Sequence, residues 1–154
     1  MKTILVPVDL SPAAARVCDA ACALAKLTGA RLVLMHVTEL APIVVGDLYA
    51  VNAAFAAEAA TAAGKYAARR LEVLARQCAR RGVEAKTVQC TDLPVTAIIG
   101  RAKSLRAAYI VIGSHGHGAV YDLVAGSTTH GVLRKARCPV LVVPIAAEKP
   151  RGKR

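Results

Sequence analysis

One window of twenty residues, 113–132, gathers most of the residues in this chain that could do chemistry. Its sequence, GSHGHGAVYDLVAGSTTHGV, holds five glycines, three histidines and a Ser-Thr-Thr cluster. Glycines let backbone N–H groups approach an anion closely, and three histidines could hold a metal ion. The window is therefore compatible with a phosphate cradle, a metal site or a flexible loop.

The two halves of this window offer different things to a ligand. Gly113 and Gly116 follow a strand-like run, AAYIVI, whereas Gly126 and Ser127 open a segment with helical character. Free N–H groups and the helix dipole favour phosphate at a helix start. We therefore expect an anion site there, with residues 117–125 forming a loop that could fold over the ligand.

The metal and enzyme hypotheses have less support in the sequence. His115 and His117 stand two apart, His130 falls in the next helix, and no carboxylate or cysteine lies at a ligand spacing beside them. The chain also lacks a G-x-S-x-G elbow, an assignable nucleophile–base pair and the G-x-x-x-x-G-K-[ST] motif, and Tyr121 interrupts G-x-G-x-x-G. We predict no protein metal ligands and no catalytic residues.

The elements that would position the window alternate between strand and helix. Apolar runs predict strands at 3–8, 31–37, 84–90, 108–113 and 139–144. Helical patterns predict helices at 12–28, 53–81, 95–106 and 127–135. Ser11 is the expected N-cap of the first helix, Pro12 its first residue and Gly29 its end, whereas Gly64 could break the second helix. The order predicts a doubly wound, Rossmann-like, five-stranded parallel sheet with helices on both faces.

In such a sheet, ligands bind beyond the carboxyl ends of the strands, where the winding reverses. Polar residues follow several of the predicted strands there, beginning with Asp9 after the first and His36 near the end of the second. The Asp9 carboxylate could accept hydrogen bonds from a ribose or a base amine. It could equally stabilise the helix that follows through the helix dipole.

Composition and charge exclude several classes of protein. The 154 residues carry a formal charge of +11, with 3% aromatic residues and no tryptophan. Much of the charge lies on one face of the second helix and in residues 148–154, and few aromatic rings are present to stack on bases. We expect no specific nucleic-acid binding, one domain over 1–147 and a basic flexible tail over 148–154.

The location of the protein is predicted from what the sequence lacks. Its longest uncharged run, residues 107–121, is 15 residues, shorter than the roughly 18 that a membrane span needs. The N-terminal residues read as a strand and not as a signal peptide. The spacing of the five cysteines matches no zinc motif. Cys18 and Cys22 share one helix face, where they could be buried side chains or a redox pair. We expect a cytoplasmic protein without a membrane segment.

The residues above resemble the universal stress protein family over essentially the whole chain, from ILVPVDLS to CPVLVVP. The nucleotide-binding branch of that family carries Gly, two residues, Gly, nine residues, then Gly followed by Ser or Thr. Gly113, Gly116, Gly126 and Ser127 reproduce this spacing without insertion or loss. LMHV and IVIGSHG also look like the family's second and fourth strand ends.

The resemblance implies ATP, with Mg²⁺ or Mn²⁺, across the switch point between the first and fourth strands. By position, Pro7, Val8 and Asp9 would line the adenosine pocket, and the backbone of Val37 would meet the adenine. Residues bordering the ribose and the phosphates would be Gly113, His115, Gly116, Gly126, Ser127 and Thr128. The resemblance also implies a homodimer through the last strand, Val140 to Val143, whose apolar edge needs cover.

The chain departs from the family in the loop HGAVYDLVA, where many relatives have a basic or small polar residue. Asp122 would repel a triphosphate there unless it points outward or holds the metal through water. We expect an ATP-binding regulator or sensor of the stress response, with an unidentified protein partner. Hydrolysis should be slow, because no general base or arginine finger is assignable. The alternative is a family member without nucleotide binding that acts as a protein-interaction or chaperone-like module.

Overall fold

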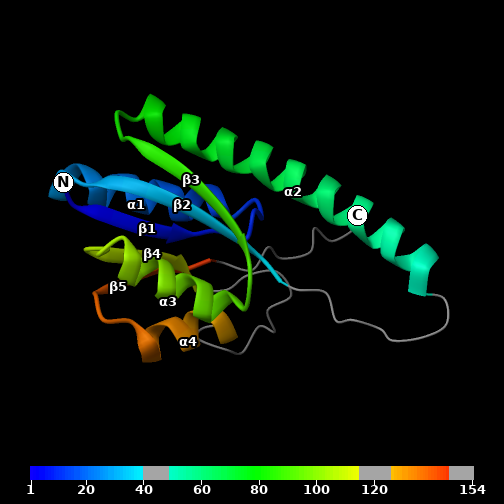
Figure 1. Cartoon of the computed structure of the whole chain (residues 1–154). Coiled ribbons are helices and arrows are strands. Elements are labelled where there is room, and N and C mark those ends of the chain that lie inside the picture. Colours follow the sequence, from blue (N-terminus) through cyan, green and yellow to red (C-terminus); the bar gives the residue numbers. More distant parts are fainter. Residues whose placement is uncertain (40–48, 115–125, 146–154) are drawn as a thin grey trace, which may run out of the picture.

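The computed structural model describes residues 1–39, 49–114 and 126–145, with side chains omitted for 49–54 (Figure 1). Its five strands are β1 (Thr3–Pro7), β2 (Arg31–Thr38), β3 (Ala85–Thr91), β4 (Tyr109–Gly113) and β5 (Val140–Val143). They form one parallel sheet in the order β3-β2-β1-β4-β5. The winding reverses between β1 and β4, so the predicted doubly wound sheet and its switch point are confirmed.

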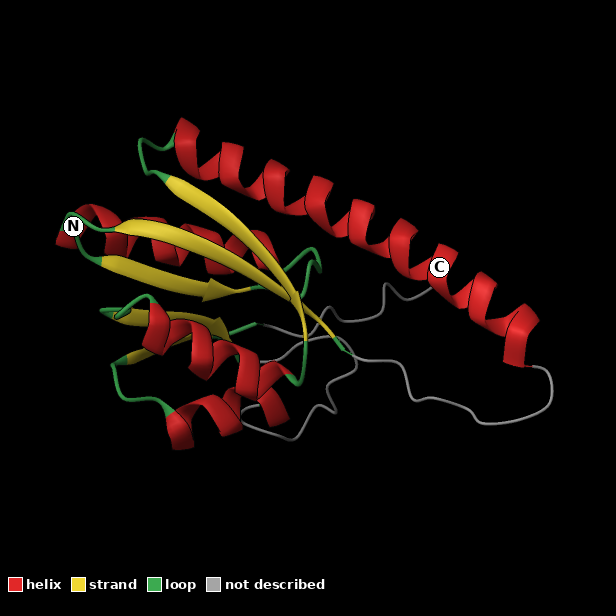
Figure 2. Ribbon diagram, viewed as in Figure 1, coloured by secondary structure: helices red, strands yellow, loops and turns green. Residues whose placement is uncertain are grey.

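Four helices cover the two faces of this sheet, as Figure 2 shows. They are α1 (Ala14–Thr28), α2 (Tyr49–Arg80), α3 (Pro94–Ser104) and α4 (Ser127–Lys135). Helices α1 and α2 pack on one face and contribute to one apolar cluster, whereas α3 and α4 contribute to a second cluster on the other face. Because the strands are parallel and strands alternate with helices along the chain, every helix begins at the carboxyl edge of the strands, where a ligand would bind.

The two clusters follow from the alternation of side chains along the strands. On β1, Ile4 and Val6 face α1 and α2, while Leu5 lies in the cluster beneath α3 and α4. All three are fully buried. Burying an aliphatic side chain of this size contributes about 1.5–3 kcal/mol, so each β1 residue anchors one of the two layers.

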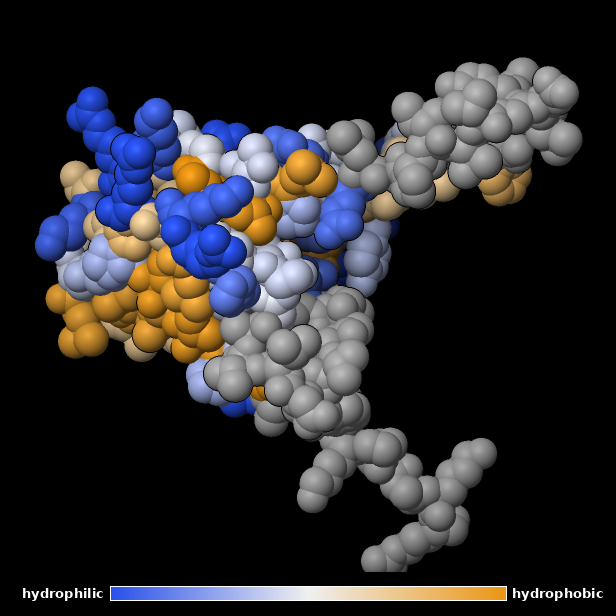
Figure 3. Space-filling model, turned by 90° about the horizontal axis from the view of Figure 1, so that it is seen from below, coloured by the Kyte–Doolittle hydropathy of each residue, from blue (hydrophilic) through white to orange (hydrophobic). Residues whose placement is uncertain are grey.

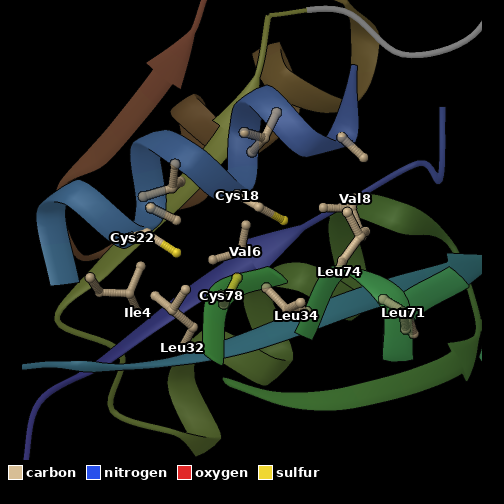
Figure 4. Close-up of a cluster of buried hydrophobic side chains, with 14 of the residues drawn as sticks. Ile4, Val6, Val8, Cys18, Cys22, Leu32, Leu34, Leu71, Leu74 and Cys78 are labelled. Carbon is tan, nitrogen blue, oxygen red and sulfur yellow. The ribbon is translucent and has the colours of Figure 1, made fainter. Parts of the chain in front are cut away.

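Three cysteines lie together between α1 and α2. Cys18, Cys22 and Cys78 are each at most 2% exposed, and Figure 4 shows their side chains within one cluster of aliphatic residues. Burial, followed by a hydrogen bond with Cys78, raises the pKa of Cys22 to about 12. The hydrogen bond with Cys18, followed by burial, raises the pKa of Cys78. The thiols of Cys22 and Cys78 therefore stay protonated at neutral pH, and all three cysteines act as small core side chains.

The predicted start of the first helix is wrong. Helix α1 begins at Ala14, not at Pro12, and its N-cap residue is Ala13. The Asp9 carboxylate instead accepts a hydrogen bond from the Ser11 amide at 3.0 Å, and Leu10 has a left-handed φ of 63°. This local turn satisfies the Ser11 amide before the helix begins. Ser11 does not cap α1 with its side chain; its backbone carbonyl accepts a hydrogen bond from the Ala14 amide at 3.0 Å.

Helix α2 is longer than the pattern predicts. It begins at Tyr49, four residues before the predicted start at residue 53, and it continues through Gly64 without a break. With its carboxamide oriented to satisfy both partners, Gln89 of β3 donates to the Gly64 carbonyl at 3.2 Å and accepts from the Ala68 amide at 3.1 Å. This side chain fastens the middle of α2 to the sheet.

Two further predictions can be compared directly with the helices. Helix α3 spans Pro94–Ser104, slightly before the expected 95–106, and Gly29 ends α1 with a φ of 64° as predicted. The expected tail, 148–154, lies outside the described residues. None of the helices that the structure describes is long and apolar enough to cross a bilayer.

Gly29 and Gly64 give a matched test of backbone conformation. A Cβ at either position would meet nothing within 4 Å, so the two sites differ in φ and not in space. We expect Gly64→Ala to raise the free energy of unfolding by about 0.5–1 kcal/mol, because alanine favours a helix interior. Gly29→Ala should lower it by about 1 kcal/mol, because its φ is left-handed. Urea unfolding measures both free energies. Changes of the same sign would contradict the view that Gly64 has a helical backbone conformation and Gly29 a left-handed one.

Candidate functional site

The end of β4 is fastened to the start of α4 by two hydrogen bonds. The Gly126 amide donates to the Ser114 carbonyl at 2.7 Å, and the Thr129 hydroxyl donates to the Gly113 carbonyl at 2.7 Å. Thr129 is only 3% exposed. The structure therefore brings together Gly113 and Gly126, which are thirteen positions apart in the sequence and were both predicted to border the site.

Ser114 extends this connection to the edge strand. Its amide donates to the Val143 carbonyl at 2.8 Å, and its hydroxyl accepts from the Ile145 amide at 2.9 Å. Ser114 and Thr129 are the two site-supporting residues that sequence reasoning missed. A serine or threonine beside glycines looks the same in the sequence whether its hydroxyl faces a ligand or a backbone carbonyl.

Among the described residues, no side chain caps the N-terminus of α4, and in this sense the start of the helix is open. Its N-cap is Gly126, with φ −65° and ψ 163°, and glycine has no side chain with which to cap the helix. Ser127 is exposed and Thr128 half-buried. The first helical N–H groups together with these hydroxyls form an arrangement that suits a phosphate group.

Helix α4 is also held closely against α3. A Cβ on Gly131 would lie 2.7 Å from Cγ2 of Val95, so no larger residue fits there without movement. The absence of a side chain at 131 lets the two helices approach each other, as glycines commonly do at close helix contacts. The open end of α4 is thereby fixed from two directions, by β4 and by α3.

The other side of the switch point is the end of β1. Pro7 pairs with Met35, and the Val8 amide donates to the Met35 carbonyl at 2.8 Å. The Val8 carbonyl lies 2.9 Å from Nδ1 of His36, which must donate because a carbonyl only accepts. Pro7 and Val8 are buried and Asp9 is half-buried, so this segment forms a firm wall with one carboxylate at its edge.

The backbone of Val37 faces the same crevice. Alternate residues of a strand direct their backbone groups to the same neighbour, and Met35 hydrogen-bonds to the β1 side. Val37, two residues further, therefore directs its amide and carbonyl toward β1, whose last paired residue is Pro7. A ligand beyond the end of β1 would meet these groups.

A cleft of about 370 Å³ lies beside this crevice, between the β1–α1 turn, the end of β2 and α2. Its lining comprises residues 9–12, His36, Thr38, Ala63, Tyr66 and Ala67. The volume is within the range of small-molecule sites. Asp9 is the predicted site residue that lines it, and α2, which no sequence argument assigned to the site, supplies one wall.

Several predicted site residues lie outside the described residues. They are His115 and Gly116, together with His117, Asp122 and the rest of the loop 117–125. Among residues 1–39, 49–114 and 126–145, no group of three or more His, Cys, Asp or Glu side chains is placed to hold a metal ion. His130 lies exposed on α4.

A parallel, doubly wound sheet with an open helix N-terminus at its switch point is an arrangement typical of nucleotide-binding α/β domains. The model of the family described as "Universal stress protein family" matches residues 1–144. The chain belongs to the universal stress protein family.

Individual relatives cover nearly the full chain. The chain is 32% identical to universal stress protein YxiE of Bacillus subtilis over 143 residues, which cover 91% of this chain and 97% of the relative. It is 36% identical to a universal stress protein of Thermus aquaticus, covering 92% and 98% of the two chains. The fold matches that of protein MJ0577 of Methanocaldococcus jannaschii with a TM-score of 0.79 at 24% identity, covering 96% and 98%.

Two structures of this fold were determined with nucleotides. One universal stress protein, with a TM-score of 0.68 at 21% identity, is in complex with cAMP and matches 93% of this chain and 96% of its own. The protein from Archaeoglobus fulgidus, with a TM-score of 0.63 at 23% identity, is in complex with dAMP and matches 92% and 97%. Both complexes contain an adenine nucleotide.

The contact between Thr129 and Gly113 can be tested by removing one hydroxyl. Thr129→Val keeps the shape of the side chain but leaves the Gly113 carbonyl without this donor. We expect the free energy of unfolding to fall by about 1–3 kcal/mol, the usual cost of an unsatisfied buried group. Thr128→Val, at the preceding residue, is the matched control and should change the free energy of unfolding by less than about 0.5 kcal/mol. Equal effects in urea unfolding would contradict the special role of Thr129.

Proposed function

We propose that this chain binds ATP, with Mg²⁺ or Mn²⁺, at the switch point between β1 and β4 and acts as a homodimeric, cytoplasmic regulator in the stress response. The observation that carries the proposal is the start of α4, which lies beside the end of β4 because the Gly126 amide donates to the Ser114 carbonyl at 2.7 Å. The adenine nucleotides bound by two proteins of the same fold support it.

Each part of the nucleotide has a counterpart in this site. Pro7, Val8 and Asp9 would line the adenosine pocket, and the Val37 backbone would meet the adenine. Gly113 would border the ribose, with His115 and Gly116 beside it. Ser127 and Thr128, after Gly126, offer N–H groups to the phosphate chain.

A divalent ion fits this set of donors through the nucleotide. Mg²⁺ prefers oxygen ligands and is commonly held by phosphates with few protein groups. The hydroxyls of Ser127 and Thr128 are oxygen donors at the phosphate end of the site, and the ion would neutralise phosphate charge there. The protein would supply the position of the phosphates and not a metal cage.

The proposed role is binding and not rapid turnover. Fast phosphoryl transfer needs a group that orients the attacking water and a cation that stabilises the transition state. The basic residues of α4, Arg134 and Lys135, lie in its last turn, at the opposite end from Ser127. We therefore expect slow hydrolysis at most, with ATP acting as a signal that alters how the protein contacts its partner.

The edge strand β5 supports the proposed homodimer. The Ile110 amide donates to the Pro139 carbonyl at 3.0 Å, and the Ser114 amide donates to the Val143 carbonyl at 2.8 Å. Residues 139, 141 and 143 thus direct their backbone groups to β4, so those of Val140 and Val142 face the open edge. Figure 3 views the molecule from below, where α4 lies in Figure 1, and shows hydrophobic residues gathered on this side. Leu133 of α4 and Leu141 of β5 are exposed. An apolar edge of this kind needs a partner strand.

The nucleotide site can be tested with Ser127→Asp. Aspartate in the first helical turn is favourable for α4, so the variant should fold. A carboxylate within about 8 Å of a phosphate costs about 2 kcal/mol at an effective dielectric constant of about 20. We expect isothermal titration with Mg²⁺ present to show ATP affinity at least about 30-fold weaker than that of the unaltered chain.

Gln77→Glu is the charge-matched control, because residue 77 is exposed near the end of α2, at the opposite edge of the sheet. Its ATP affinity should equal that of the unaltered chain. Equal binding by Ser127→Asp would place the phosphates elsewhere. No binding of ATP by the unaltered chain would reject the proposed function and favour the protein-interaction alternative.

The dimer can be tested at the backbone of β5. Val142→Pro removes the N–H group that faces the open edge and leaves the groups that pair with β4, and proline is tolerated on edge strands. We expect light scattering after size-exclusion chromatography to show a monomer for Val142→Pro. Val142→Thr, which keeps the N–H and the strand propensity, should remain a dimer. A dimeric Val142→Pro would exclude pairing through this edge.

A further inference from the structure

We infer that Tyr66 of α2 stacks on the nucleobase and gives this site a preference for purine nucleotides. The inference rests on the proposed nucleotide site and adds a wall that the glycine spacing does not include. Tyr66 lines the cleft of about 370 Å³ beside the ends of β1 and β2, together with Ala63 and Ala67 of the same helix. The occupant of the cleft would be a purine base.

The face that α2 presents to the cleft suits a flat ligand. Ala63, Tyr66 and Ala67 follow the i, i+3, i+4 spacing and so lie on one side of the helix. Two of these side chains are small, which lets a planar group approach the helix closely. Tyr66 is 59% exposed, so its ring has surface that a ligand can cover.

The helix holds Tyr66 in a fixed place. Gln89 hydrogen-bonds to the backbone of α2 at Gly64 and Ala68, on either side of Tyr66 in sequence. One turn further, Leu71 is fully buried against the sheet, and Leu74 is 3% exposed. Because the backbone at Tyr66 is fixed, binding would order only the two side-chain torsions of its ring, which limits the entropy cost.

The facing wall supplies a second ring and polar groups. His36 comes from β2, and its ring is fixed by the 2.9 Å hydrogen bond from Nδ1 to the Val8 carbonyl. Asp9 and Thr38 also line the cleft and provide oxygen atoms for the polar edge of a base. A base between α2 and β2 would have an aromatic surface on one side and hydrogen-bonding groups at its rim.

The chemistry of stacking determines the expected selectivity. A base stacked on an aromatic side chain typically gains about 1–3 kcal/mol, which is about a 5- to 150-fold change in affinity. Stacking increases with the shared surface, so purines should bind more tightly than pyrimidines. The gain should not depend on the tyrosine hydroxyl, because phenylalanine offers the same ring face.

The test compares Tyr66→Ala, Tyr66→Phe and Phe55→Ala by isothermal titration with ATP, CTP and inorganic tripolyphosphate, each with Mg²⁺. Phe55 is the matched control, because it lies on the same helix, is 77% exposed and does not line the cleft. We expect Tyr66→Ala to weaken ATP binding about 5- to 150-fold and to leave tripolyphosphate binding unchanged. Tyr66→Phe and Phe55→Ala should bind ATP like the unaltered chain.

The ratio of ATP affinity to CTP affinity should be smaller in Tyr66→Ala than in the unaltered chain. Because the chain has no tryptophan, quenching of tyrosine emission on ATP binding is a second readout, and most of it should disappear in Tyr66→Ala. Equal ATP affinity in Tyr66→Ala and the unaltered chain would overturn the inference and leave the proposed function standing. No ATP binding by the unaltered chain would overturn both.

Discussion

The geometry of the site depends on the hydrogen bonds that join the end of β4 to the start of α4. The carbonyls of Gly113 and Ser114 accept from the Thr129 hydroxyl and the Gly126 amide, each at 2.7 Å. Together with the close approach of Gly131 to Val95, they fix the start of α4 relative to the sheet. The same serine joins β5 to the arrangement, so the proposed ligand site and the proposed dimer edge share one buried residue.

The four consecutive residues 126–129 have two different kinds of contact. The Gly126 amide and the Thr129 hydroxyl are used within the protein, so neither is offered to a ligand. Ser127 and Thr128, between them, keep their hydroxyls at the accessible start of the helix. The Gly-Ser spacing of the family motif therefore describes only part of the proposed site, because Thr129 helps to position the pair proposed to face the phosphates.

The sequence predicted the sheet because its evidence was repeated along the chain. Five apolar runs separated by helical patterns leave few other topologies. Predictions that rested on a single residue were less reliable. Serine is a favoured N-cap residue, but the Asp9 carboxylate binds the Ser11 amide in a separate turn, and α1 begins three residues later, at Ala14. Gly64 weakens a helix by type, yet α2 continues because the helix is fastened to the sheet on either side of Tyr66. The place of Tyr66 in the cleft could not be predicted, because no local pattern shows that α2 passes beside the ends of β1 and β2.

The distribution of charge along the helices favours an anion at the carboxyl edge of the sheet. None of the four described helices has an acidic residue in its first turn, whereas each has a basic residue in its last turn. Basic groups thus compensate the negative ends of the helix dipoles at the opposite edge. The first turns at the positive ends hold no acid, and the nearest described carboxylates before α1 and α3 are those of Asp9 and Asp92, which accept from backbone amides. In a parallel doubly wound fold, all four positive ends point to the edge where the site lies.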